Sequence, residues 1–227
     1  MAGVTAGEIP LPAIRSTSVD DQWWQADTAE ARINVYLRCI YSTAFCDRIR
    51  EGWGRLPEAT RSLIGSFRHL EDEQQARVAN VRAALTRSCP LVWGVLDDAA
   101  IDAALSVWVD SDEFWEGVGR TLPESFCLIV YRLSRDEHPF EAEVARLQGV
   151  CNALMAMSSP TSPWPSHVVS MRPGGLSESF TSGYRLVDEN GLLARDRVSG
   201  PNHAFSIVVR ARLGAVQVES TEVWRKP

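Results

Sequence analysis

The sequence predicts an α+β protein, with an N-terminal helical layer followed by a small C-terminal antiparallel sheet. Up to Met157, apolar residues recur at three- and four-residue steps, as they do on one face of a helix. After a Ser/Pro-rich stretch they alternate with polar residues, which is typical of half-buried strands. Because the helices precede the strands instead of alternating with them, the α+β class is favoured over a parallel α/β sheet.

The same patterns divide the 227 residues into four parts. Residues 1–22 have scattered apolar positions among Gly, Pro, Ser and Thr, and they predict a flexible arm. Residues 23–157 form the predicted helical domain. The prolines of residues 158–166 cannot continue a helix and predict a linker. Residues 167–227 form the predicted antiparallel β region.

The first predicted helix runs from about Thr28 to Arg50. Asp27 and Glu30 have the spacing of a capping box before it, and Gly52 and Gly54 follow its end. Its apolar positions fall at helical steps and predict a buried stripe made of Ile33, Leu37, Ile40, Tyr41, Ala44 and Phe45.

The remaining helices are predicted from caps and prolines. Pro57 opens a short helix to about Ile64, and a more polar helix from Glu71 to Leu85 stops at Cys89-Pro90. Asp97 and Ser111 can cap helices that carry the apolar sets Ile101, Leu105 and Trp108, and Phe114, Trp115 and Val118.

Two helices with stronger signals follow. Thr121 and Glu124 form a capping box before Phe126–Tyr131, a run that is apolar all round and predicts a central buried helix. Pro139 opens a last helix with an inward stripe of Val144, Leu147, Cys151 and Leu154.

Period-two segments after the linker predict five strands, at residues 167–171, 184–188, 192–196, 204–212 and 215–223. Asn190-Gly191 and Leu213-Gly214 are the turn signals between them. In the fourth segment Phe205, Ile207, Val209 and Ala211 share one face, as in a strand with one side buried.

Composition excludes several classes of function. A net charge of -6 argues against nucleic-acid binding, and Lys226 as the single lysine leaves no catalytic lysine in the body of the chain. No apolar run is long enough to span a bilayer. The five cysteines form no CxxC pair and no secretory signal precedes them, so we expect reduced thiols in a cytoplasmic protein.

No catalytic or metal site is predicted in this chain. The four histidines are scattered, and the closest groupings, His69 with Glu73 and His138 with Glu141, are typical of solvated or capping histidines. The acidic cluster around Asp112 is more typical of helix caps than of acid/base pairs. We therefore expect no cofactor in the chain itself.

A binding surface is the remaining possibility. A small terminal sheet can have a free edge, which an extended peptide completes as an added strand. The alternative is that the N-terminal arm or the linker covers that edge.

Two segments resemble a known family. Arg32-Ile33-Asn34-Val35-Tyr36-Leu37-Arg38, continued by Tyr41, Thr43 and Phe45, resembles the opening helix of MbnC, the small partner subunit in methanobactin biosynthesis. Val107-Trp108-Val109 followed by Glu113-Phe114 is similar to a second MbnC segment. Asn34, Ala44 and Asp112 depart from the family pattern, which has aspartate, a larger aliphatic residue and serine there.

This resemblance implies a non-catalytic partner of MbnB, a TIM-barrel oxidase with a multinuclear iron site. Together such subunits use O₂ to convert cysteines of a ribosomally made, MbnA-like precursor peptide into oxazolone and thioamide groups, which yields a copper chelator. The β region would hold the leader peptide, and the helical part would dock on the barrel. The residues expected to contact the partner or the peptide are Arg32, Arg38, Tyr41, Tyr184, Arg185, Arg210 and Arg212.

Three alternatives stay open at this point. The arginines and Tyr41 of the first helix can instead close the helix bundle. The chain also resembles a TglI-like subunit, which would serve a similar iron barrel that removes carbon from the terminal cysteine of a peptide. The third is a helical scaffold or regulator without peptide chemistry.

Overall fold

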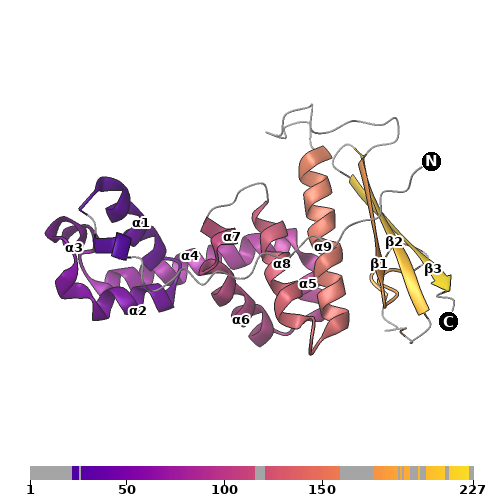
Figure 1. The fold of residues 1–227 in the computed structure, drawn as a ribbon, viewed down its shortest axis with the longest axis horizontal. Helices are drawn as coiled ribbons and strands as arrows, with labels where there is room; N and C mark the ends of the chain where they lie inside the picture. The colour runs from indigo at the N-terminus through magenta and orange to yellow at the C-terminus, as the bar shows by residue number, and fades with distance from the viewer. Residues whose placement is uncertain are drawn as a thin grey trace.

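A computed structural model describes residues 22–25, 27–115, 121–158, 176–188, 190, 192–194, 199, 203–212 and 215–224. Helices make up its N-terminal part and a three-stranded antiparallel sheet its C-terminal part, which confirms the predicted α+β class. Figure 1 shows the helices extending along the long axis, with α1 (Ala29–Cys39) and the sheet at opposite ends. The predicted arm, nearly all of the linker and the predicted strand at 167–171 lie outside the described residues.

The first predicted helix is wrong as a continuous element, because the chain forms α1 and then α2 (Thr43–Glu51). Ser42 between them has an extended backbone, and its Oγ accepts a hydrogen bond from the Phe45 amide at 2.9 Å. This is an N-cap, which starts a new helix. Thr28 caps α1 instead of Asp27, since Thr28 Oγ1 accepts from the Ala31 amide at 3.1 Å.

The break changes which residues face the core. Ile33 and Leu37 are 55% and 37% exposed and Ala44 is exposed as well, so the predicted stripe is wrong at these three positions. Val35 and Cys39 are buried in their place. The residues of the N-terminal core cluster are Val35, Cys39, Ile40, Phe45, Cys46, Ile49, Leu56, Ile64 and Leu70.

Short elements complete the N-terminal end and connect it to the centre. The helices are η1 (Gln22–Gln25), η2 (Trp53–Arg55), α3 (Glu58–Ile64, as predicted), α4 (Phe67–Ser88), α5 (Pro90–Val95), α6 (Asp98–Val109) and α7 (Asp112–Trp115). Within α4 only Leu70 and Leu85, near its two ends, are buried, so this helix bridges two cores. The predicted stop at Cys89-Pro90 is confirmed, because α4 ends at Ser88. Pro90 then begins α5, which was not predicted, since the first turn of a helix does not need the amide that proline lacks.

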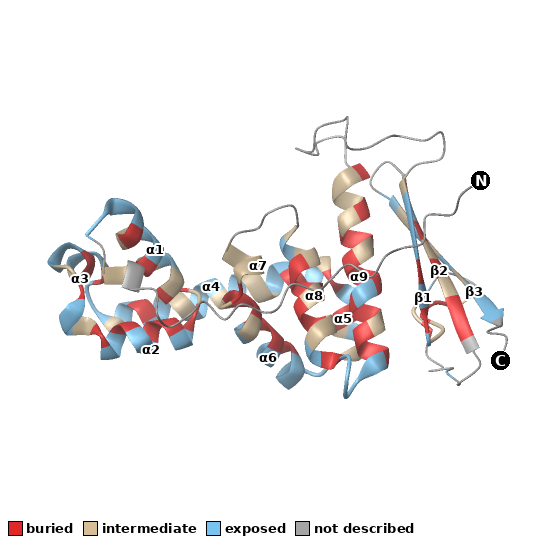
Figure 2. Ribbon diagram, in the orientation of Figure 1, coloured by how far each residue is buried: buried red, intermediate tan, exposed pale blue. Residues whose placement is uncertain are grey.

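The two strongly signalled helices are confirmed as α8 (Leu122–Ser134) and α9 (Pro139–Ser158). The capping box of Thr121 and Glu124 is present in both directions. Phe126 is fully buried in the central core, and all four residues of the predicted α9 stripe are buried. Figure 2 shows the burial concentrated where α8 and α9 lie together.

The sheet has the order β1-β2-β3, with β1 (Leu176–Ser182), β2 (His203–Arg212) and β3 (Ala215–Trp224) all antiparallel. The last two confirm the predicted strands. The segments predicted as strands at 184–188 and 192–196 form no strand over their described residues, which make only the isolated antiparallel bridges Tyr184↔Ser199 and Val187↔Leu193. Residues 195–196 lie outside the described residues. β1 was not predicted because Leu176 and Phe180 are its only large apolar residues, and backbone pairing with β2 holds it.

Candidate functional site

The seven residues predicted to contact a partner or peptide fall into two groups. Arg32, Arg38 and Tyr41 belong to α1 and the turn that follows it, and the other four belong to the β region. These two regions lie at opposite ends of the molecule (Figure 1). The structure therefore does not bring the seven residues together, and any shared ligand has to extend along the molecule.

In the first group, two side chains are engaged by α7. The Arg38 guanidinium lies 4.9 Å from the ring centroid of Trp115, and the Tyr41 ring packs edge-on against Phe114 at 5.3 Å and Trp115 at 5.9 Å. Tyr41 thus connects the N-terminal core to the central one. Arg32 forms an ion pair with Asp27 at 3.0 Å and stays partly exposed.

In the second group, Tyr184 packs edge-on against Phe140 of α9 at 5.6 Å, and Arg185 beside it is partly buried. Arg210 is exposed and forms an ion pair with Glu219 of β3 at 2.5 Å. Arg212 ends β2, opposite Ala215, and only its backbone belongs to the described part of the structure. Arg210 can therefore contact a ligand on the solvent face of the sheet, whereas Tyr184 is packed against α9.

One face of the sheet is fixed by α9. Phe205, Ile207 and Val209 of β2 are buried and share a core with Phe140, Val144, Leu147, Cys151 and Leu154 of α9. Ile207 and Val209 are fully removed from water. The sheet consequently rests on a packed helix and is held in a fixed twist and register.

The edges of the sheet remain open among the described residues. Strand order makes β1 and β3 the outer strands, and each has one side without a described strand partner. On β3, Thr221, Glu222 and Val223 are exposed. An outer strand presents unpaired amides and carbonyls, so strand addition is the chemistry that this element supports.

A surface at the other end was missed by the sequence reasoning. Ile33 and Leu37 are four residues apart on α1, so they lie on the same face of the helix, and both are exposed. They belong to the motif that resembles MbnC but not to the core. The signal that could have found them is the alternative stripe Ala31, Val35 and Cys39, which has the same four-residue step.

The pKa values of two partly buried carboxyl groups are shifted, in opposite directions. Burial raises the pKa of the Glu113 carboxyl, but the hydrogen bond from Arg132 at 2.5 Å and its positive charge outweigh burial and hold the pKa below its ordinary value. For Glu143 the net shift is upward. Burial raises its pKa by more than the charge of Arg146, at 3.8 Å, and a hydrogen bond from Ser182 lower it. Each group joins neighbouring elements, and neither has a second carboxyl partner in these contacts.

Within the described part of the chain, no group of three or more His, Cys, Asp or Glu residues is placed to hold a metal ion. No helix in that part is long and apolar enough to cross a membrane. All five cysteines are free thiols and buried. No protein family, characterised protein or solved structure matches the chain.

Proposed function

We propose that this chain is a peptide-binding partner subunit of an iron-dependent oxidase, of the MbnC kind, which presents the cysteines of a ribosomally made precursor peptide to a TIM-barrel subunit. The multinuclear iron and the O₂ chemistry, which forms oxazolone and thioamide groups, belong to that partner. This chain contributes recognition and positioning. Its sheet binds the leader, and its helical end binds the barrel.

The outer edge of β3, which has no strand partner among the described residues, is the observation that carries this proposal. A leader peptide that adds as a fourth strand gains main-chain hydrogen bonds without needing a preformed pocket. The core shared by α9 and the sheet supports this mode, because a rigid template spares the peptide the cost of ordering its binding site. The exposed Arg210 and its partner Glu219 offer charges beside the added strand.

The exposed pair Ile33 and Leu37 supports docking of the barrel at the opposite end. Arg38 and Tyr41 of the same motif are engaged by α7, so the aliphatic pair is the part of the motif left for a partner. Aliphatic side chains at the centre of an interface contribute by leaving water on association. Arg32, at 31% exposure beside them, is suited to the polar rim.

Proline substitutions on β3 test the leader site. Successive amides of a strand point to opposite edges, so of Thr221 and Glu222 one donates toward β2 and the other points to the open edge. Proline at the outward position removes an edge donor and leaves the β2–β3 ladder intact. We expect one of the variants Thr221→Pro and Glu222→Pro to keep the wild-type unfolding midpoint yet bind the leader at least tenfold more weakly.

The measurement is a fluorescence-anisotropy titration of the full chain with a labelled, Cys-containing precursor peptide of the MbnA kind, together with urea unfolding of each variant. Thr221→Ala and Glu222→Ala serve as matched controls, because they shorten the same side chains and keep both amides. Wild-type affinity in the proline variant that retains its stability would exclude strand addition at β3.

A further inference from the structure

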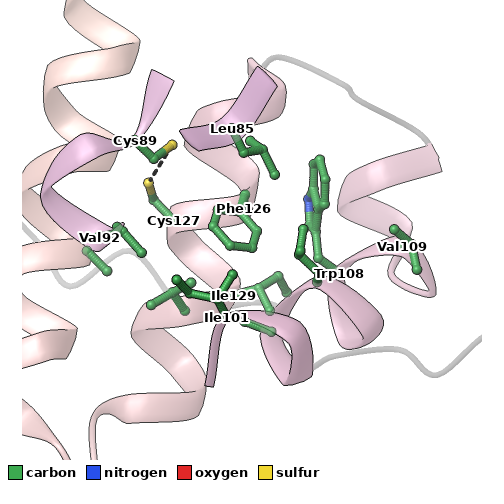
Figure 3. Packing of buried hydrophobic residues seen from close by; sticks show 13 residues of the cluster. Leu85, Cys89, Val92, Ile101, Trp108, Val109, Phe126, Cys127 and Ile129 are labelled. Atoms are coloured by element: carbon green, nitrogen blue, oxygen red, sulfur yellow. Dashed lines mark hydrogen bonds between the residues drawn. The ribbon is translucent and has the colours of Figure 1, made fainter. Parts of the chain in front are cut away.

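The central core contains two thiols in contact. Cys89 is the residue before α5 and Cys127 lies in α8, and their sulfur atoms are 3.7 Å apart although the residues are 38 positions apart in the chain (Figure 3). Both side chains are at most 1% exposed. The proposed function does not use either of them.

The two sulfur atoms are not equivalent. The Cys127 thiol donates to Cys89 Sγ, and Asn152 Nδ2 of α9 donates to the same sulfur at 3.5 Å. These hydrogen bonds lower the pKa of Cys89 even though burial opposes them. The hydrogen bond to Cys89 and burial raise the pKa of Cys127. Cys89 is thus the sulfur that becomes a thiolate first, and Cys127 keeps its proton.

We propose that Cys89 and Cys127 form a reversible oxidation site, at which a small peroxide converts the pair of thiols into a disulfide. The Cys89 thiolate attacks one peroxide oxygen, the O–O bond breaks, and Cys89 becomes a sulfenic acid as hydroxide leaves. Cys127 sulfur then attacks Cys89 sulfur, and the hydroxyl leaves with the Cys127 proton as water. Two thiols lose two electrons in total, and hydrogen peroxide is reduced to two molecules of water.

The spacing of the two sulfur atoms fits closure to a disulfide. A disulfide needs the sulfur atoms to close from 3.7 Å to about 2.05 Å. A side-chain carbon at Gly149 would lie 3.3 Å from Cys127 Cβ, so α9 packs tightly behind Cys127. Cys89 stands at the junction of α4 with the six-residue α5, and Gln148 of α9 bonds to both sides of this junction, at the Ser88 carbonyl and the Leu91 amide.

The third thiol of this region provides an internal control. Cys151 of α9 is buried as well, but there burial is the only cause of the shift and raises the pKa to about 12, so this thiol stays protonated and reacts slowly with peroxide. It also has no hydrogen bond from Asn152, which the structure directs to Cys89.

The test uses the full reduced chain. It is treated with a twofold excess of hydrogen peroxide, unfolded, alkylated with iodoacetamide, digested and mapped by mass spectrometry. We expect a Cys89–Cys127 linked peptide, with the other three cysteines alkylated. The oxidised chain should unfold at a higher temperature than the reduced chain, and dithiothreitol should remove both the link and the shift.

Matched variants give a second readout. Cys151→Ser should form the link at the wild-type rate, whereas Asn152→Leu, which keeps both thiols and deletes the donor to Cys89, should form it several-fold more slowly. Alkylation of all five cysteines after peroxide treatment would overturn the proposal, and so would a link confined to Cys39 and Cys46. If the Asn152→Leu and wild-type chains formed the disulfide at equal rates, the hydrogen bond from Asn152 would not activate Cys89.

Discussion

Glu113 and Arg132 show how a single pair of side chains joins two elements. Glu113 lies in α7 and Arg132 in α8, and their side chains are only 16% and 7% exposed. Within the described residues, Arg132 Nε and Nη2 are buried without a hydrogen-bond partner. The ion pair with Glu113 therefore offsets most of the cost of burying this cation. Sequence reasoning treated the acidic cluster as caps, because nothing local reveals a partner 19 positions away.

Replacing Glu113 tests that interpretation. We expect Glu113→Gln to lower the free energy of unfolding by about 3–5 kcal/mol, since it leaves a buried guanidinium unpaired. The double variant Glu113→Gln/Arg132→Met should recover part of the loss. Glu71→Gln, which breaks the exposed ion pair with Arg50, is the control and should cost less than about 1 kcal/mol. Urea unfolding at neutral pH measures all three.

The same pair makes stability depend on pH. The folded-state pKa of Glu113 lies below its ordinary value, so its contribution is complete above the ordinary glutamate range and is lost as pH falls through the folded-state pKa. The stability difference between the wild type and Glu113→Gln should therefore shrink on acidification. A difference that stays constant down to acid pH would contradict this assignment.

Among the helices and strands, several predictions that depended on local signals were accurate, although the cap predicted at Asp27 was not. The capping box at Thr121, Pro57 before α3 and Pro139 at the start of α9 placed their helices correctly. The break after α1 was missed because Ser42 interrupts an apolar pattern that continues across it. Periodicity detects a face but does not detect an interruption that keeps the period.

Ser42 provides the prediction for this break. Its side chain is 2% exposed and caps α2 through the Phe45 amide. We expect Ser42→Ala to lower the free energy of unfolding by about 1–2 kcal/mol, because a buried amide loses its acceptor. Thr43→Ala is the control, since Thr43 is exposed at the next position and should change stability by less than about 0.5 kcal/mol. Equal losses in the two variants would mean that the cap does not hold α2.

The molecule as a whole places its two candidate surfaces at opposite ends, with α4 and the central core between them (Figure 1). The contacts of Tyr41 and Arg38 with α7 connect the N-terminal end to that core. A peptide held at the sheet and an oxidase held at α1 would therefore be separated along the long axis, and the intervening peptide would run along the helical part.

The α1 surface is tested with the barrel subunit. When the chain is co-expressed with an iron-barrel oxidase, we expect an iron-containing heterodimer, and we expect Ile33→Asp/Leu37→Asp to lose co-purification. The free chain carrying both substitutions should unfold like the wild type, because both residues are exposed. Asn34→Asp adds a charge on α1 without removing an aliphatic contact and serves as the control. Undiminished co-purification of the double variant would place the barrel elsewhere.

Some features of this protein follow from local order along the chain. Neighbouring residues determine the helix caps, the α9 stripe and the alternation of β2. The α+β class and the last two strands were therefore predictable. The resemblance to MbnC also rests on residues close together in the sequence.

Other features depend on contacts between distant segments. Pairing with β2 made a strand of the polar β1, the packing of α1 decided that Val35 and not Ile33 is buried, and the meeting of α5 with α8 brought Cys89 to Cys127. Burial and register are collective properties, because each residue's environment is set by whichever segment packs against it. A pattern within one segment can offer two alternative faces, as it does in α1, but it does not choose between them.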